Sequence, residues 1–395
     1  MKLLIVCPAL PCPTGGGGIR NYSLMKLLAR KHSVSLLTLA ESAQLEIYQG
    51  KYPFADFIDS IQVVPHPRHV SKRLSQAINI IRGKPYILAT HTVADMQTML
   101  DALLSRDYYD FVIFESVVVA NYCLPNNVKI IIDEHNIEYE ICQRTYHRET
   151  AGLRKWYNWV EYRLLKPHEL ELCRRASAVL VTSERERLAL KSMLPGSVIE
   201  VVPNGVDIET FQEVYPEREV PGRIIFTGAM TYHANVDAVI FFAQKCWPLI
   251  QAQIPGATWQ IVGRNPPPEV QRLARYPDIT VTGSVPDVRP YLAEASVAIA
   301  PLLVGSGTRL KILEALAMRK VVVSTEVGCE GLSVESGKHL VVATQPEAFA
   351  QAVVYLLKHP EMRVQLGAAG RLLVEAEYNW EQSGNRLLRI LEEIH

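Results

Sequence analysis

The chain contains 395 residues, of which 48% are hydrophobic and 21% are charged. These proportions exclude a disordered chain, a collagen and a disulfide-stabilised miniprotein, and the length favours two or three domains. Because 41 basic residues balance 41 acidic residues, a protein that binds nucleic acid over its whole surface is disfavoured, and we expect no nucleic-acid partner.

The cysteines and the N-terminus indicate the compartment. The 7 cysteines form no C-x-x-C pair, so we expect reduced thiols in a cytoplasmic protein and no structural zinc. The apolar N-terminus stops at Pro8 without a cleavage signature, which favours a first strand over a signal peptide. The sequence has no run of about 20 apolar residues, so we expect no membrane-spanning helix.

Strand-like and helix-like segments alternate along the chain. The expected strands lie at 2–7, 33–38, 61–64, 110–115, 128–133, 178–182 and 199–202, and then at 223–227, 258–262, 279–282, 297–300, 321–324 and 340–342. Several are continuous runs of β-branched residues, which are typical of parallel sheets covered by helices on both faces. We therefore predict an α/β fold with two Rossmann-like parallel-sheet domains that face each other across a cleft.

A polar segment separates the two halves. It begins near Pro203 and runs to Gly222, and its middle is acidic and poor in aliphatic residues, as expected of a surface connection. We predict domains at 1–202 and 203–375, followed by a last amphipathic helix within 376–395.

Four consecutive glycines, 15–18, follow the first expected strand. Backbone N–H groups of such a loop can approach a phosphate closely, and the N-terminus of the next helix adds partial positive charge. The spacing is neither the G-x-G-x-x-G dinucleotide pattern nor a Walker A pattern. A flexible loop without a ligand is the alternative.

A second candidate site is the run GSGTRLKILE at 305–314, which follows the strand ending at Ala300. Small residues open a helix there, and Arg309 and Lys311 place positive charge beside its free N–H groups, a combination that suits a diphosphate. Glu314 lies about one turn into the helix, where it can accept hydrogen bonds from ribose hydroxyls. The alternative is an ordinary exposed helix start.

His135 follows the strand at 128–133 and could orient or deprotonate a substrate hydroxyl. A histidine packed in a loop is the alternative, and Glu115, at the end of its own strand, is a weaker candidate. Basic residues are interleaved with aromatic residues over 154–159 and just beyond. They could contact a membrane surface, but we favour an ordinary helix whose Trp and Tyr side chains pack on the core.

Together these motifs resemble the family 4 retaining glycosyltransferases of the GT-B fold, over nearly the whole chain, and most closely bacterial sugar transferases of exopolysaccharide and cell-surface glycan synthesis. The resemblance rests on the glycine loop and on PNGVD at 203–207, FTGAM at 226–230, NVD at 235–237, VG at 262–263, GSVPDVRPY at 283–291, GSGTRLKILEALA at 305–317 and EVG at 326–328.

The resemblance implies an enzyme that transfers a hexose or related sugar, with retention, from a nucleotide diphosphate sugar to a glycan or lipid-linked acceptor in surface polysaccharide synthesis. It implies no metal or other cofactor, and a cytoplasmic protein with possible peripheral contact to the inner membrane face. The domain at 1–202 would serve the acceptor and that at 203–375 the donor, and the helix within 376–395 would cross back to the first domain.

The resemblance also implies residue roles. Glu314 would hold the donor ribose, the backbone at 308–310 the diphosphate, and Val285 the base, while His135 would lie near the transferred sugar. The implied catalytic residues are His135, Arg309 and Lys311, and the implied substrate-binding residues are Gly16, Gly17, Gly228, Arg264, Val285, Gly307, Thr308, Leu310 and Glu314.

The sequence departs from the family pattern at two positions. Ser306 stands where the family has the first Glu of its E-x7-E motif, and Ala229 stands where an Arg usually follows Gly228. The cation at the leaving diphosphate would then come from Arg309 or Lys311, with Arg264 behind them. Two alternatives stay open, namely a non-catalytic nucleotide-sugar binding protein and, with less support, an NAD-dependent oxidoreductase.

Overall fold

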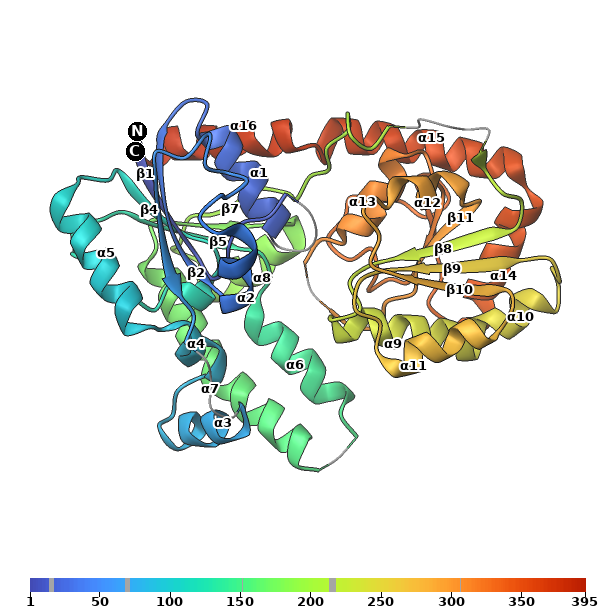
Figure 1. Cartoon of the computed structure of the whole chain (residues 1–395), viewed down its shortest axis with the longest axis horizontal. Coiled ribbons are helices and arrows are strands. Elements are labelled where there is room, and N and C mark those ends of the chain that lie inside the picture. Colours follow the sequence, from blue (N-terminus) through green and yellow to red (C-terminus); the bar gives the residue numbers. More distant parts are fainter. Residues whose placement is uncertain (14–17, 68–71, 151, 213–217, 306) are drawn as a thin grey trace. The chain divides into compact units, whose positions relative to one another are not determined.

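The computed structural model describes residues 1–13, 18–67, 72–150, 152–212, 218–305 and 307–395. The chain forms two compact units (Figure 1). Unit 1 comprises Met1–Pro203 and Ser383–His395, and unit 2 comprises Asn204–Gln382. The units therefore divide after residues 203 and 382, compared with the predicted boundaries after 202 and 375.

Unit 1 is built on a seven-stranded parallel sheet of order β3-β2-β1-β4-β5-β6-β7. Its strands are β1 (Lys2–Cys7), β2 (Ser33–Ala40), β3 (Ser60–Pro65), β4 (Phe111–Phe114), β5 (Ile130–Glu134), β6 (Ala178–Val181) and β7 (Ile199–Val201). The central strands are buried along their whole length, as their unbroken apolar runs require. The direction in which strands are added reverses between β1 and β4.

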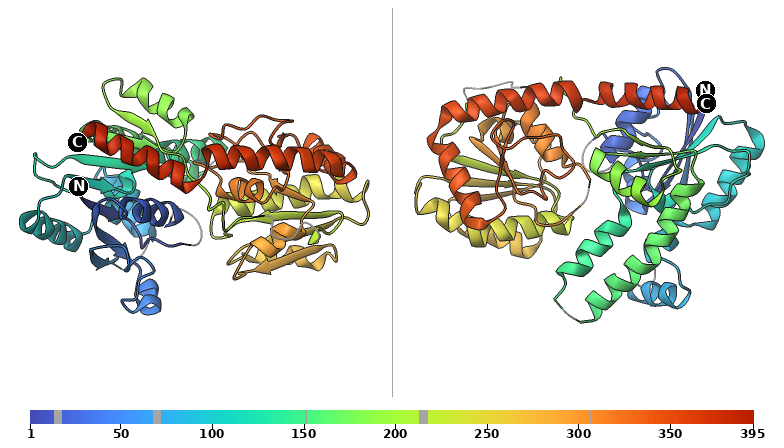
Figure 2. Two further views of the ribbon diagram at one scale, coloured as in Figure 1. Left: turned by 90° about the horizontal axis from the view of Figure 1, so that it is seen from above. Right: turned by 180° about the vertical axis from the view of Figure 1, so that it is seen from behind.

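Helices flank the sheet of unit 1 (Figures 1 and 2). They are α1 (Gly18–Leu28), α2 (Ser42–Tyr48), α3 (Lys72–Ile81), α4 (Tyr86–His91), α5 (Ala94–Arg106), α6 (Glu138–Arg148), α7 (Leu153–Arg175) and α8 (Glu184–Met193), with a 3-10 turn, η1, at Val117–Val119. Of these, α3 and the first turns of α7 lie away from the sheet. The final helix, α16 (Trp380–Ile394), belongs to unit 1 from Ser383 onward. Its buried residues include Leu387, Leu388, Ile390 and Leu391.

Unit 2 is built on a six-stranded parallel sheet of order β10-β9-β8-β11-β12-β13. Its strands are β8 (Arg223–Thr227), β9 (Thr258–Val262), β10 (Ile279–Gly283), β11 (Val297–Ala300), β12 (Val322–Ser324) and β13 (Val341–Val342). Its helices are α9 (His233–Phe241), the π-helical η3 (Phe242–Cys246), α10 (Trp247–Gln251), α11 (Pro268–Gln271), the 3-10 turn η4 (Arg272–Arg275), α12 (Arg289–Glu294), α13 (Leu310–Ala317), α14 (Pro346–Lys358) and α15 (Pro360–Glu377).

The predicted class of two parallel-sheet α/β domains is confirmed. Every segment predicted as a strand contains one, including the apolar N-terminus, which forms β1. Among the described residues, no helix has the length and hydrophobicity needed to cross a membrane.

The prediction that the aromatic residues at 154–159 pack on the core is wrong for both tryptophans. Trp156 is 53% exposed and Trp159 is 42% exposed. The physical reason is that the first turns of α7 lie beside α6 and α3 rather than against the sheet (Figures 1 and 2). The core contacts of α7 come from Leu165 and Leu172, further along the helix.

Candidate functional site

The carboxyl ends of β8 and β11 meet at the point where the strand order of unit 2 reverses. Open parallel sheets bind ligands at such a point because the loops on either side diverge there. Gly228 follows β8 directly, and the loop after β11 leads into α13. The sequence-predicted residues Gly228, Lys311 and Glu314 are therefore brought to one edge of one sheet.

Helix α13 begins at Leu310, and Arg309 is its N-cap residue. Ile312, Leu313 and Leu316 bury the inner face of the helix, so its first turn is fixed in place. Thr308 Oγ1 is buried and has no hydrogen-bond partner within the described structure. An unpartnered buried hydroxyl beside a helix N-terminus suits an anion that accepts its hydrogen bond.

Lys311 brings its ammonium group back to β8. Its Nζ donates a 2.7 Å hydrogen bond to Oδ1 of Asn235 and lies 3.9 Å from the centroid of the Phe226 ring. Burial, with added repulsion from Arg309 and an opposing attraction from Glu314, lowers the pKa of Lys311 to about 7. An arriving anion would favour the charged form of this amine.

Arg309 and Glu314 complete the charged groups of α13. Arg309 is 8% exposed, and its Nη1 donates a 2.8 Å hydrogen bond to the carbonyl oxygen of Gly307. Burial raises the pKa of Glu314 to about 7, against the attraction of Lys311. Such perturbed pKa values are typical of ligand sites, where charged groups are already buried before the ligand binds.

Two glycines allow the loops after β8 and β9 to approach each other. A Cβ atom built on Gly263 would lie 1.9 Å from the carbonyl oxygen of Gly228, and one built on Gly228 would lie 2.6 Å from Lys311 Nζ. Any side chain at either position would therefore displace the backbone or the ammonium group.

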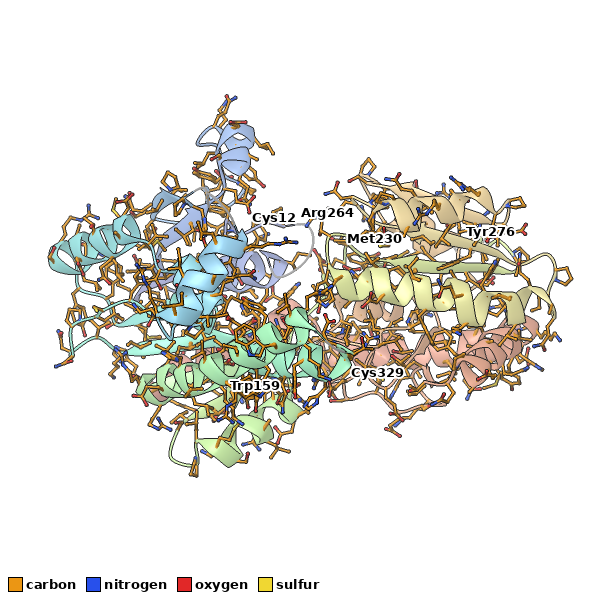
Figure 3. All side chains as sticks on the ribbon, turned by 90° about the horizontal axis from the view of Figure 1, so that it is seen from below. Cys12, Trp159, Met230, Arg264, Tyr276 and Cys329 are labelled. Atoms are coloured by element: carbon orange, nitrogen blue, oxygen red, sulfur yellow. The ribbon has the colours of Figure 1, made fainter. Side chains whose placement is uncertain are left out.

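The remaining predicted residues of unit 2 lie on neighbouring loops. Arg264 is exposed in the loop after β9, and its carbonyl oxygen accepts a 3.0 Å hydrogen bond from the backbone N–H of Met230; Figure 3 labels both residues. Val285, after β10, is half-buried against the core. Gly16 and Gly17, and also Ser306, lie outside the described residues.

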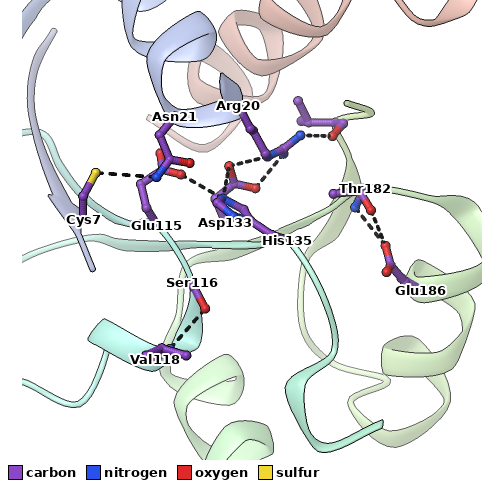
Figure 4. A network of polar contacts seen from close by, with 11 residues as sticks. Cys7, Arg20, Asn21, Glu115, Ser116, Val118, Asp133, His135, Thr182 and Glu186 are labelled. Carbon is purple, nitrogen blue, oxygen red and sulfur yellow. Dashed lines mark hydrogen bonds and ion pairs between the residues drawn. The ribbon is translucent and has the colours of Figure 1, made fainter. Parts of the chain in front are cut away.

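Unit 1 holds a second polar cluster at its own reversal point, between β1 and β4 (Figure 4). Arg20 of α1 is 2% exposed and makes a bidentate ion pair with Asp133, at 2.8 Å from Nε and 2.6 Å from Nη2. Its Nη1 donates a 2.8 Å hydrogen bond to the carbonyl oxygen of Val202. His135 Nε2 lies 3.0 Å from Glu115 Oε2 and 3.6 Å from Asp133 Oδ2.

His135 is held as a cation. Burial alone would lower its pKa, but the hydrogen bonds and negative charges of Asp133 and Glu115 outweigh burial and raise the pKa to about 9. At neutral pH the ring is therefore protonated. Of the two roles left open by the sequence, this charge favours orienting a hydroxyl over removing its proton.

The ligand atoms of Glu115, Asp133 and His135 lie within 4.8 Å of one another, a spacing that a metal ion could use. The Arg20 guanidinium and the His135 imidazolium already balance the two carboxylates, so the cluster needs no further cation. The absence of a metal requirement stays a prediction.

The sequence assigned no role to Arg20, Asp133 or Asn235, and it missed the pairs that they form. Arg20 and Asp133 are 113 residues apart, and Asn235 and Lys311 are 76 residues apart, so no local spacing could pair them. Their positions were the available signal. Arg20 follows the glycine loop, Asp133 lies on β5 next to β4, and Asn235 lies in the helix that follows β8.

Comparison with known proteins gives matches over both halves of the chain. The model described as "Glycosyltransferase Family 4" matches residues 14–210, and that described as "Glycosyl transferases group 1" matches residues 221–359.

Two curated relatives match parts of the chain. The "Uncharacterized 44.6 kDa protein in cps region" of Klebsiella pneumoniae is 22% identical over 266 residues, covering 64% of this chain and 66% of the relative. The second relative is a GDP-mannose-dependent monoacylated alpha-(1-6)-phosphatidylinositol monomannoside mannosyltransferase of Corynebacterium glutamicum. It is 28% identical over 216 residues, and the match covers 49% of this chain and 56% of the relative. The match spans less than two thirds of either relative.

Solved structures match over the whole length. Sucrose-phosphate synthase from Thermosynechococcus elongatus is 16% identical with a TM-score of 0.74, and the match covers 100% of this chain and 99% of the other. Anabaena HepE in complex with UDP-glucose is 14% identical with a TM-score of 0.69, and the match covers 100% of both chains. At these identities the likeness shows the fold alone, and it confirms the predicted GT-B class.

Proposed function

Because the chain belongs to the glycosyltransferases of family 4 and group 1, we propose that it transfers a sugar from a nucleotide diphosphate sugar to a glycan or lipid-linked acceptor. The prediction of a glycosyltransferase is thus confirmed at the level of the family. Retention at the anomeric carbon, a role in surface polysaccharide synthesis and independence of metals and cofactors are parts of the proposal.

The observation that carries the proposal is the charged edge of the sheet in unit 2. The start of α13, the unpartnered hydroxyl of Thr308 and the cations Arg309 and Lys311 lie at the carboxyl end of β11, with Glu314 one turn further. During transfer, the bond between the anomeric carbon and the diphosphate oxygen breaks, and negative charge develops on the leaving group. Fixed N–H dipoles and buried cations stabilise that charge better than water does.

The atoms balance without a further reactant. The anomeric carbon gains a bond to the acceptor oxygen on the face from which the diphosphate departs, and the acceptor proton passes to the leaving diphosphate. His135, held as a cation by Glu115 and Asp133, would donate a hydrogen bond that orients a sugar hydroxyl. Glu314 would accept hydrogen bonds from the donor ribose.

The relatives support particular donors. HepE is described in complex with UDP-glucose, and the mannosyltransferase relative is described as GDP-mannose-dependent. We therefore propose a UDP- or GDP-linked hexose as the donor. The relative from a cps region supports a role in surface polysaccharide synthesis, and a location in the bacterial cytoplasm is a further part of the proposal.

A thermal-shift panel tests the proposal. UDP, GDP, ADP, dTDP, their sugar conjugates and NAD are added to the wild type, to Glu314→Ala and to the control Glu347→Ala, which changes an exposed acid at the start of α14. Ligand at about a hundred times its dissociation constant stabilises by roughly 2.7 kcal/mol. We expect one nucleotide family to shift the wild type and the control but not Glu314→Ala.

Two other outcomes of these experiments would favour the alternative functions. A shift with NAD alone would favour the oxidoreductase. Binding of a nucleotide sugar without hydrolysis or transfer to any glycan or lipid-linked acceptor would favour the non-catalytic binding protein.

Peripheral membrane contact is also part of the proposal, and a surface of unit 1 supports it. Leu74, Ile78 and Ile81 are exposed on α3, as are Leu153, Trp156 and Trp159 on α7. The two helices lie side by side (Figures 1 and 3). Residues 60–94 contain no Asp or Glu, while Arg73, Arg82 and Lys84 are exposed. Exposed tryptophans among basic residues are typical of helices that bind anionic lipid surfaces.

Sedimentation with vesicles tests this contact. We expect the wild type to sediment with phosphatidylglycerol vesicles but not with phosphatidylcholine vesicles, and to be released by salt. The double change Trp156→Ser and Trp159→Ser should abolish sedimentation, whereas Tyr276→Ser, which removes an exposed aromatic from unit 2, should not. Wild-type protein that stays in the supernatant with anionic vesicles would refute the contact.

A further inference from the structure

The loop after β8 has no cation of its own. From Gly228 to Asn235 it contains neither Lys nor Arg, although this is the edge of the sheet where the proposed donor diphosphate would bind. The ammonium group of Lys311, which comes from α13, lies there instead. It takes up the space beside Gly228 that a side chain would need, since a Cβ at Gly228 would come within 2.6 Å of it.

We infer that Asn235 is the positioning residue that holds the Lys311 ammonium group at the carboxyl end of β8, ready for the diphosphate of the donor. The inference rests on the proposed function and deepens it, because it names the group that sets where this cation lies.

The amide of Asn235 connects two elements. Its Nδ2 donates a 2.8 Å hydrogen bond to the carbonyl oxygen of Ala229, and its Oδ1 accepts the 2.7 Å hydrogen bond from Lys311 Nζ. The first bond fixes which way the amide faces, so the oxygen is the atom turned to the ammonium. Asn235 is 7% exposed, so water is excluded as a substitute acceptor on most of its surface.

The charges around Lys311 explain why the Asn235 amide matters for the protonation of the Lys311 amine. The charges that act on the ammonium are Arg309, which repels it, and Glu314, which attracts it; Phe226 of β8 and Asn235 of α9 contribute a ring face and a neutral oxygen. Burial and Arg309 disfavour the charged form. The Asn235 oxygen is a neutral acceptor that is held in place. It favours the charged form of the Lys311 amine and does not cancel the positive charge, which stays available to an anion.

Binding of UDP, GDP, ADP and dTDP to the wild type, Asn235→Leu and Asn235→Asp is measured by calorimetry between pH 6 and pH 9. In the wild type, affinity for the bound nucleotide should fall as pH rises through the Lys311 titration. Asn235→Leu should bind about tenfold more weakly at pH 7, and its affinity should begin to fall at a lower pH. Asn235→Asp should also bind more weakly, because the site loses net positive charge, but its affinity should begin to fall at a higher pH.

Asn379→Leu is the matched control. Asn379 belongs to the same unit and is 8% exposed, and its Nδ2 also donates to a backbone carbonyl, that of Glu375 at 2.6 Å. We expect this change to lower the melting temperature without moving the pH at which affinity falls. If both Asn235 variants behave in the same way as this control, Asn235 is only a structural link and the inference is wrong.

A second readout needs no nucleotide. Acetylation of Lys311 by acetic anhydride, followed by mass spectrometry over the same pH range, reports the titration of the amine directly. If the wild type binds none of the nucleotides but the two Asn235 variants move this titration in opposite directions, the proposed function fails while the positioning role stands. An unchanged Lys311 titration in both variants overturns the positioning role whether or not a nucleotide binds.

Discussion

Two carboxylates face the imidazole ring of His135. The sequence places it at the end of a strand and allows it to act as a base, but Glu115 and Asp133 surround its Nε2. With a pKa raised to about 9, against about 6.5 for an unperturbed histidine, the ring is a fixed positive charge at neutral pH. Its effect on stability then follows from that difference.

We predict that His135→Gln destabilises unit 1 at low pH and has little effect at high pH. The folded-state pKa lies above the unfolded value, so the stabilisation is complete below about pH 6.5 and is lost as pH rises through about 9. On the order of 3 kcal/mol is expected at pH 6. Urea unfolding at pH 6, 8 and 10 measures the difference, and a difference that grows with pH would contradict the assigned charge.

Lys311→Met should lower turnover about a hundredfold, because the leaving diphosphate loses a buried cation. The fall in kcat/KM at alkaline pH that comes from Lys311 should disappear in this variant. Lys358→Met, which changes an exposed lysine at the end of α14, is the control and should retain wild-type kinetics. Steady-state assays with the donor identified by the thermal-shift panel measure both, and a hundredfold loss in the control would point to general damage.

The sequence allows residues within one motif to be predicted, because Arg309, Lys311 and Glu314 lie within six positions of one helix start. It does not reveal partners that are joined only by folding. Asp133 was visible at the end of β5, but its bidentate contact with Arg20 depends on how α1 crosses the sheet. Asn235 was visible in a family motif, but its hydrogen bond to Lys311 depends on how folding brings the start of α9 and the Lys311 side chain of α13 together at the carboxyl end of β8.

At the scale of elements, the strands were predictable because each is a short, continuous apolar run in a doubly covered sheet. The exposure of α7 was not predictable, because the spacing of aromatic residues in a helix does not tell whether a sheet or solvent lies against them. Trp156 and Trp159 are thus exposed in a helix whose later turns are part of the core.

The close approach of two strand ends gives a prediction at this scale. Gly263→Ala would place a Cβ 1.9 Å from the carbonyl oxygen of Gly228, so the loops after β8 and β9 must separate. We expect a loss of roughly 1–3 kcal/mol of stability, as for other overpacked sites, together with weaker nucleotide binding.

Gly256→Ala is the matched control, because a Cβ at Gly256 would have nothing within 4 Å. Differential scanning fluorimetry and calorimetric titration compare the two variants. Equal melting temperatures in both would show that the loops after β8 and β9 can move apart at no cost.

At the scale of the whole molecule, the chain passes between the units twice, after residues 203 and 382. Residues 383–395 belong to unit 1, where Gly384 packs closely against Leu27 and Lys129 Nζ donates hydrogen bonds to the carbonyl oxygens of Ile394 and His395. Composition indicated only an amphipathic last helix, and it was the family resemblance that implied a helix crossing back to the first domain.

Deletion of residues 383–395 should therefore unfold unit 1 and spare unit 2. Leu387, Leu388, Ile390 and Leu391 are all buried, and burial of each such side chain contributes about 1.5–3 kcal/mol. Their combined loss approaches the whole stability of an ordinary domain. Limited proteolysis with mass spectrometry should yield a protected fragment near residues 204–382, and a protected fragment from residues 1–203 would contradict this expectation.

The same helix sets an order of events during synthesis. A ribosome that has made residues 1–203 has made every strand of unit 1 but none of the residues of α16 that complete its core. We therefore expect apolar surface of unit 1 to stay uncovered while the whole of unit 2 is translated and becomes free to fold. Although domains commonly fold in the order in which they emerge, we expect unit 2 to complete its fold before unit 1, because unit 2 is translated in full before residues 383–395.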